Sequence, residues 1–291
     1  MPIELAHNGA TAILFPEFGG RLHQLFVPVG GVDEPLLESP FDPAEYRDHP
    51  ARGGCFPMAP WPNRIRDGQF SWAGREWRVP LDGEPHAIHG RVHTVPWRVV
   101  ARTGRVCEMD APFDEGWPWE GKAWQRFELR DRSLLMKLEV RSAREPFPAG
   151  CGWHPCFRRD VAGAPGVQVS LSATRRYVLD EHLPTGELAP VEDIYDFRND
   201  FLGDRRLDDC YTGLLGPIEI NWGRLSLQIT TDCLYPHVQV YTPEEAFCVE
   251  PQTCAPDAFN LAARRATNDG TQIARPGAAV SITSEWTWST R

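Results

Sequence analysis

The 291-residue sequence lacks the features that mark several common classes of protein. No apolar run approaches the roughly 20 residues that a membrane-spanning helix needs. The first nine residues, MPIELAHNG, contain no basic segment followed by an apolar stretch, so we expect no export signal and a cytoplasmic location. The phosphate-binding patterns GxxxxGK(S/T) and GxGxxG are absent, as is the serine-nucleophile pattern GxSxG. Phosphoryl transfer, hydride transfer and serine hydrolysis are therefore disfavoured.

Basic charge is also in short supply. The chain has 30 Lys and Arg against 40 Asp and Glu, which gives a formal net charge of −10. A surface of this sign repels phosphate backbones and anionic lipids, so we expect neither a nucleic acid nor a membrane as a partner. A neutral small molecule such as a sugar is not excluded.

Paired cysteine motifs are missing as well. No two of the eight cysteines form a CxxC pair, and a chain of this size does not need disulfides to fold. We expect reduced thiols, most of them buried as small apolar residues. The eight are Cys55, Cys107, Cys151, Cys156, Cys210, Cys233, Cys248 and Cys254.

Helical patterns are sparse, whereas short strand patterns are common. Apolar and polar residues alternate, with many β-branched or aromatic side chains, in four segments: Ser133–Ser142, Arg224–Thr231, His237–Thr242 and Ala278–Thr290. Alternating strand–helix units, internal repeats and low-complexity linkers are not found. The sequence therefore predicts an all-β fold, a large antiparallel β-sandwich with few short helices, as one domain over residues 1–291.

Local signals add detail to this prediction. Asp67-Gly68 predicts a type I′ hairpin turn that leads into Gln69–Trp72. Ala73-Gly74 predicts a second turn, before Trp77–Val79. The best helix is Asp257–Arg265, with Asp257 as a possible N-cap.

Three histidines lie close together in the segment HAIHGRVH. The spacing of His86, His89 and His93 invites a metal-binding hypothesis. Residues three apart on a strand point to opposite faces, and no thiolate or carboxylate cluster completes the set. We therefore predict no metal at this segment.

Two other ionisable residues precede prolines, which favours an extended backbone at each. In CGWHPCF, a strand would place Gly152, His154 and Cys156 on one face and Trp153 on the other. A histidine among aromatic residues is more often a core residue than a functional one. Glu250 ends the apolar run of AFCVEP, so it either emerges into solvent or is held in a polar site.

Three further pairs allow two interpretations each. Arg64 and Arg66 share a side of an extended chain but also suit a surface hairpin. Asp208 and Asp209 fit a paired-carboxylate site or, more simply, an Asx-type turn. Trp117 and Trp119 fit a sugar-stacking loop, although packing beneath a loop is the commoner role.

Seven segments between residues 54 and 260, taken in order, resemble the aldose 1-epimerase (galactose mutarotase) family. Each is weak alone, but their order is specific, and GCFPMAPWPNRIR (54–66) further resembles a bacterial branch of uncharacterised mutarotase-like proteins. The segments are NRIRDGQFSWAG (63–74), HAIHG (86–90), CGWHPCF (151–157), PTGELAPV (184–191) with DFRND (196–200), LDDCYTG (207–213), VQVYTP (238–243) and CVEPQTCAPDAFN (248–260).

The resemblance implies a large antiparallel β-sandwich that interconverts the anomers of a free sugar without a metal or other cofactor. By motif, His154 resembles the general acid and Glu250 the general base. His89 resembles a second histidine near the ring oxygen, and Arg64 and Asp208 resemble sugar-binding residues. Assignment to Asp208 rather than Asp209 depends on one position of alignment. After HG, relatives carry a Gly-rich or aromatic stretch where this chain has Arg91-Val92-His93, a loop expected to border the cleft.

Three alternatives remain on the same fold. A non-catalytic sugar-binding protein would keep the cleft without the chemistry. A hexose-6-phosphate 1-epimerase would need cations at the far end of the cleft, for which Arg66 and Arg91 are candidates. A glycosidase or polysaccharide lyase would need two carboxylates, and Asp208 with Glu250 could supply them. Exposed edge strands permit a homodimer but do not require one.

Overall fold

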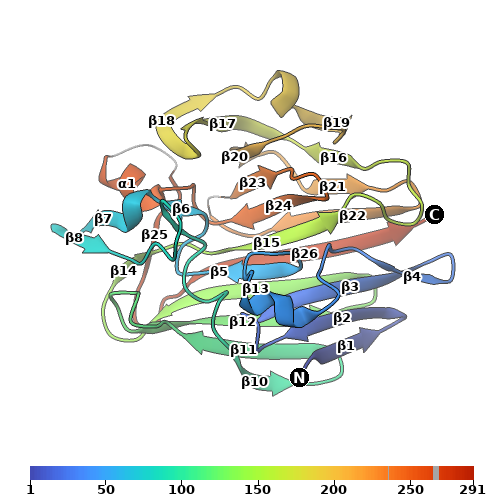
Figure 1. Ribbon diagram of the computed structural model, residues 1–291, viewed down its shortest axis with the longest axis horizontal. Coiled ribbons are helices and arrows are strands. Elements are labelled where there is room, and N and C mark those ends of the chain that lie inside the picture. The colour runs from blue at the N-terminus through green and yellow to red at the C-terminus, as the bar shows by residue number, and fades with distance from the viewer. Residues whose placement is uncertain (235, 265–268) are drawn as a thin grey trace.

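The computed structural model describes residues 1–234, 236–264 and 269–291. Regular structure in these residues is mostly β-strand, arranged as two large antiparallel sheets packed face to face (Figure 1). This arrangement confirms the predicted antiparallel β-sandwich.

The first sheet has eleven strands within the described residues. Their spatial order is β1 (Ile3–His7), β2 (Ala10–Phe15), β3 (Arg21–Val29), β5 (Cys55–Met58), β15 (Gly152–Arg158), β24 (Ala246–Gln252), β23 (His237–Tyr241), β20 (Asp208–Leu214), β17 (Ala173–Asp180) and β18 (Leu183–Ala189), with β4 (Val32–Pro35) paired to β3. Strands far apart in the sequence thus meet at its centre, where β15 lies between β5 and β24.

The second sheet has nine strands in the same described part of the chain. Their order is β10 (Arg98–Arg102), β11 (Val106–Pro112), β12 (Gly121–Leu129), β13 (Ser133–Ser142), β26 (Val280–Thr290), β22 (Leu225–Thr231), β21 (Ile218–Asn221), β16 (Gln168–Leu171) and β19 (Phe197–Phe201). The four strands predicted from alternation are β13, β22, β23 and β26, with ends that differ by at most two residues.

The inner faces of the two sheets share one hydrophobic core. Phe157 of β15 contacts Trp286 of β26 with ring centroids 5.1 Å apart, and neither side chain is exposed. Complete burial of a phenylalanine contributes about 1.5–3 kcal/mol to stability. Contacts of this kind hold the sheets together and position the central strands of the first sheet from their inner face.

Smaller elements surround the sandwich. They are the ribbons β6 (Arg64–Ile65) with β9 (Ala87–Ile88), β7 (Gln69–Trp72) with β8 (Arg75–Arg78) and β14 (Phe147–Ala149) with β25 (Gln272–Ala274), the helix α1 (Ala258–Ala263), and the 3-10 turns η1 (Pro43–Arg47), η2 (Arg66–Gly68) and η3 (Asp193–Tyr195). Among the described helices, none has the length and apolar character needed to cross a bilayer.

The two predicted turns have different outcomes. Ala73 and Gly74, with φ of 51° and 75°, connect the paired strands β7 and β8 as expected. Asp67 and Gly68 also have positive φ, 51° and 61°, but the strands beside them pair elsewhere, β6 with β9 and β7 with β8. The hairpin predicted at Asp67-Gly68 is therefore wrong, because turn chemistry specifies a chain reversal but not the partners of the flanking strands.

The predicted helix is present, and Asp257 occupies its N-cap position but makes no side-chain capping hydrogen bond. Helix α1 covers Ala258–Ala263, and the last predicted residue, Arg265, lies outside the described residues. Asp257 has φ of 54° and makes no capping hydrogen bond to the helix backbone. Its buried carboxylate instead accepts from the Arg66 backbone N–H at 2.9 Å and from the Asn260 side-chain amide at 2.7 Å. Asp257 thus ties α1 to the turn after β6.

Candidate active site

Strands β15 and β24 lie side by side in the middle of the first sheet, and residues on both of their faces are buried. The inner face contributes Trp153, Phe157 and Val249 to the core. The outer face carries polar side chains. Pro155 and Pro251 favour an extended backbone in the residues before them, and side chains alternate between the two faces along each strand.

The strand register arranges the outer-face side chains in two rows. Because Gly152 pairs with Gln252 and Cys156 pairs with Cys248, His154 lies opposite Glu250. The rows continue into β23 and β20. One row consists of His154, Glu250 and Gln239. The row beside it consists of Cys156, Cys248, Tyr241 and Asp208.

His154 and Glu250 make a direct contact. The Nε2 atom of His154 lies 3.2 Å from Oε1 of Glu250, and the two side chains are 9% and 1% exposed. The imidazole stacks on Phe56 of β5, with centroids 4.6 Å apart and planes inclined by 18°. The aromatic stack and the strand register fix the imidazole against the carboxylate, although the two residues are 96 positions apart.

Burial and mutual attraction shift the pKa of both groups. Burial raises the pKa of Glu250, and the His154 charge offsets this only in part. Burial alone would lower the pKa of His154, but the Glu250 carboxylate and Cys156 outweigh it and hold the pKa above the usual value for histidine. The pair therefore keeps a proton at neutral pH, shared between an imidazole and a carboxylate.

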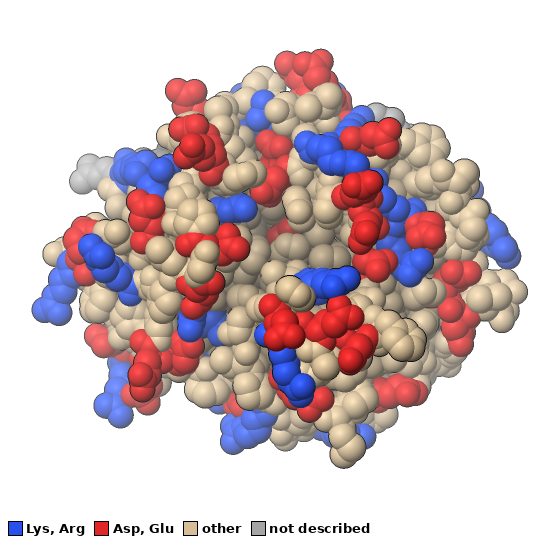
Figure 2. Space-filling model, viewed as in Figure 1, with Lys and Arg blue, Asp and Glu red and all other residues tan. Residues whose placement is uncertain are grey.

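A cavity of about 750 Å³ opens above this pair. The two rows form its floor, and loops that cover the first sheet form its walls. Figure 2 shows this face of the molecule hollowed near its centre, with acidic and basic side chains around the opening. The wall segments are 38–40, 51–53, 63–64, 88–89 and 243–246.

Arg64 and Asp208 lie together in the cavity. Arg64 Nη1 is 3.5 Å from Asp208 Oδ2, and the Gln239 amide donates to Oδ1 at 2.6 Å. The neighbouring Asp209 is on the opposite face of β20, with its carboxylate 3.7 Å from Arg176. The structure thus separates two aspartates that the sequence alone does not distinguish: Asp208 lines the cavity and Asp209 does not.

His89 reaches the cavity from the end of β9. Its φ is 59°, its backbone N–H donates to the Asn63 carbonyl, and its ring lies edge-on to His154 with centroids 5.1 Å apart. Burial, reinforced by the nearby positive charge of His154, lowers the pKa of His89 well below the usual value. A side chain at Gly90 would place a Cβ 2.1 Å from the Ala59 carbonyl oxygen, so this glycine allows the close approach that seats His89.

The residues after Gly90 are arranged otherwise than expected. Arg91 forms ion pairs with Asp82 and Asp114, at 2.7 Å to the latter, and Arg66 extends toward Asp257. Within the described residues, neither arginine lines the cavity, nor does any other residue of 91–93. The expectation that this loop borders the cleft is wrong, because Arg91 is drawn to two carboxylates outside it.

Of the three neighbouring histidines, His89 and His93 lie edge to face with ring centroids 6.1 Å apart, and His86 lies elsewhere. His86 Nδ1 lies 3.2 Å from the Asp67 backbone nitrogen, away from the other two. His93 packs against Phe56 with centroids 5.3 Å apart, and burial together with Arg21 lowers its pKa to about 3. His86, His89 and His93 thus form no common metal site in the described structure.

The paired tryptophans have a packing role. Trp117 and Trp119 are 3% and 5% exposed, and their rings lie 5.1 Å apart within a cluster that includes Phe70 and Phe147. The sugar-stacking interpretation is therefore not supported.

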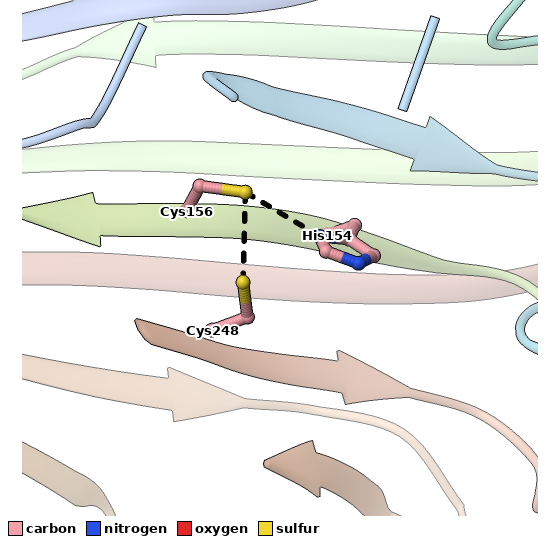
Figure 3. Close-up of side chains that lie close together, drawn as sticks. All are labelled: His154, Cys156 and Cys248. Carbon is pink, nitrogen blue, oxygen red and sulfur yellow. Dashed lines mark hydrogen bonds between the residues drawn. The ribbon is translucent and has the colours of Figure 1, made fainter. Parts of the chain in front are cut away.

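Cys156 and Cys248 are among the cavity residues that were not predicted from the sequence. Each is two positions from a predicted catalytic residue, His154 or Glu250, so strand alternation places all four on one face. Only the register between β15 and β24 brings the two cysteines together, as Figure 3 shows. Seven of the eight cysteines are buried, as expected for small apolar residues.

The fold and the site define the class of protein before any comparison. It is a β-sandwich of two antiparallel sheets with a buried imidazole–carboxylate pair on the floor of a cavity. A family model described as aldose 1-epimerase matches residues 1–285. The chain therefore belongs to the aldose 1-epimerase family.

Individual relatives are distant. The uncharacterised protein YihR of Escherichia coli is 26% identical over 220 residues, 70% of each chain. Human galactose mutarotase is 30% identical over 139 residues, which cover 45% of this chain and 40% of the human protein.

Solved structures match over the whole chain. The aldose epimerase homologue of C. elegans superposes with a TM-score of 0.85, 20% identity and coverage of 100% and 99% of the two chains. Galactose 1-epimerase from Lactobacillus acidophilus superposes with a TM-score of 0.79 and 18% identity, covering 99% and 94%. At such identities these likenesses establish the fold alone.

Proposed function

We propose that this chain, acting as one domain, is an aldose 1-epimerase that interconverts the α and β anomers of a free aldose. The observation that carries the proposal is the contact between His154 Nε2 and Glu250 Oε1 on the floor of the cavity. Membership of the family supports the same class of reaction.

The reaction needs two proton transfers, one at each of the two oxygens bonded to C1. Glu250 as carboxylate removes the proton from O1, and His154 as imidazolium gives a proton to the ring oxygen while the C1–O5 bond breaks. Rotation about C1–C2 turns the aldehyde, and the reverse transfers close the ring on its other face. General acid or base assistance is worth on the order of 10²–10⁴-fold for each group, which suffices for a reaction that already proceeds in water.

The remaining cavity residues fit the binding of sugar hydroxyls. Arg64 and Asp208 offer a donor and an acceptor at one side of the cavity, and neutral His89 lies beside the ring of His154. Family membership supports an interaction between these groups and a pyranose.

A phosphorylated sugar is less favoured. The cavity rim includes Glu38, Glu244 and Glu245, whose charges would repel a phosphate. Arg66 and Arg91, the cations considered for that role, are directed elsewhere. We therefore propose a neutral sugar as substrate. We also propose that the protein acts in the cytoplasm and that the step requires no metal or nucleotide.

A polarimetric panel tests the proposal. Freshly dissolved α-galactose, α-glucose, arabinose and their phosphates are followed with and without the protein. We expect faster decay of optical rotation for at least one free aldose and a smaller effect on its phosphate. Sugar affinity without acceleration would instead identify a binding protein, and release of reducing ends from an oligosaccharide would identify a glycosidase.

A further inference from the structure

Three soft or borderline metal-ligand atoms meet on the cavity floor. They are a ring nitrogen of His154, Sγ of Cys156 and Sγ of Cys248, and all lie within 4.8 Å of one another. Figure 3 shows the three side chains on the same side of the sheet, two from β15 and one from the adjacent β24. The residues are 7%, 8% and 0% exposed.

The spacing of the donors is close to that of a zinc coordination shell. The two Sγ atoms are 3.5 Å apart, and Cys156 Sγ lies 3.8 Å from His154 Nδ1. Tetrahedral coordination, with Zn–S of about 2.3 Å and Zn–N of about 2.0–2.1 Å, places ligand atoms roughly 3.5–3.8 Å from one another. Two edges already have this length, and the third, at no more than 4.8 Å, shortens to it by a movement of about 1.3 Å at most.

The strand pairing makes the cluster rigid. The Cys156 backbone N–H donates to Gly54, and its carbonyl accepts from Glu38, so both groups point away from β24. Cys156 and Cys248 therefore form a non-hydrogen-bonded pair, the arrangement that brings opposite side chains closest in an antiparallel sheet.

The cluster also has an entry path and an open side. His154, Cys156 and Cys248 all line the cavity, so an ion reaches them without unfolding of the sheet. A fourth ligand, water or a sugar hydroxyl, would approach from the cavity. Three protein ligands with one position open is the pattern of an accessible zinc site rather than a closed structural one.

We propose that His154, Cys156 and Cys248 form a binding site for a borderline or soft divalent cation of the Zn²⁺ and Cd²⁺ class. Two thiolates and an imidazole select such ions over Mg²⁺ and Ca²⁺, which prefer oxygen ligands. The site shares His154 with the proposed acid–base pair but uses its other nitrogen, since Nε2 faces Glu250.

A consequence follows that rests on the proposed function. A cation on Nδ1 occupies the place of a proton, so the imidazole cannot be protonated on both nitrogens while the metal is bound. His154 then keeps only the proton on Nε2, as a metal-bound neutral imidazole, and is a far weaker acid than the imidazolium that ring opening requires. Zinc is thus expected to inhibit the epimerase reversibly.

Cobalt titration of the full chain under a non-chelating reductant tests the site directly. We expect one Co²⁺ per chain, with thiolate-to-cobalt charge-transfer absorption and tetrahedral d–d bands, displaced by Zn²⁺. Cys248→Ser should weaken binding by at least about 100-fold. Cys107→Ser, at a buried cysteine of β11 outside the cavity, is the matched control and should bind as the parent does. A cobalt spectrum without thiolate bands, or equal affinity in both variants, would overturn the proposal.

A second variant and a rate measurement complete the test. Cys156→Ser should show the same loss, which guards against a folding defect specific to the Cys248 variant; unchanged binding in it would contradict the ligand set. Zn²⁺ should abolish the acceleration of mutarotation by the parent, with recovery on adding EDTA, whereas Cys248→Ser should resist. If the parent accelerates no aldose, the cobalt result still decides the metal site and only the proposed function fails.

Discussion

The two sheets are built alike but are covered differently. In the second sheet, buried and half-buried residues alternate along β13 and β26, as expected for strands with one face in solvent. In the first sheet, β15 and β24 are buried on both faces, and their outer face forms the floor of a cavity. The difference lies in the loops above each sheet.

Whether loops cover a sheet decides whether its charged side chains stay in water or are buried. On the second sheet, Lys137 and Glu139 form an ion pair at 2.8 Å, with the lysine 40% exposed. Solvent screens such pairs, and they contribute little to stability. On the first sheet, Glu250 and His154 meet at a similar distance but are removed from water, so the pKa of each is raised above its usual value.

The largest expected effect is a loss of activity on substituting a glutamate of the first sheet, compared with a glutamate of the second sheet. Glu250→Gln should lower the enzymatic rate of anomer exchange by about 10²–10⁴-fold, because an amide cannot accept the O1 proton. Glu219→Gln, at an exposed position of β21, should leave the rate unchanged. Polarimetry gives the rates, and circular dichroism checks that both variants fold. Undiminished activity of Glu250→Gln would remove this residue as the base.

The pH dependence of activity should reflect the burial of Glu250 and His154 on the first sheet. Glu250 must be ionised, so activity falls as pH drops through its pKa, which burial raises above the usual value near 4.5. His154 must be protonated, so activity falls as pH rises through its pKa, which Glu250 holds above 6.5. In a pH profile of kcat/KM measured with EDTA present, the acidic limb should lie above pH 4.5 and the alkaline limb above pH 6.5. An alkaline limb at or below pH 6.5 would contradict the pairing.

A smaller effect should distinguish the two faces of one strand. Asp208→Asn removes a charged acceptor from the cavity and should raise KM roughly tenfold or more, with a lesser change in kcat. Asp209→Asn alters the opposite face of β20 and should leave KM as it is. Equal changes in the two variants would mean that Asp208 does not contact the sugar.

The smallest effect is expected on the second sheet. Lys137→Ala breaks the ion pair with Glu139 and should change the free energy of unfolding by less than about 1 kcal/mol, measured by urea denaturation. Its activity should equal that of the parent. A loss of several kcal/mol would show that this face is less solvated than its burial pattern indicates.

Prediction from sequence succeeded at β13, a strand with one face toward water. The period-two pattern of Ser133–Ser142 gave β13 with its exact residues, since solvent selects polar side chains at alternate positions. The same signal is weak in β15 and β24, where both faces are buried. There the candidate site residues were predicted from the resemblance of short motifs rather than from periodicity.

The sequence by itself determined the local terms: an extended backbone before Pro155 and Pro251, strand-forming alternation, and the side-chain types available for proton transfer. Only the tertiary structure decided which of these side chains meet. Register sets His154 against Glu250 and Cys156 against Cys248, and it turns Asp208 into the cavity and Asp209 out of it. The reason is that pairing between distant strands depends on the burial of the whole sandwich, which no short segment of the chain encodes.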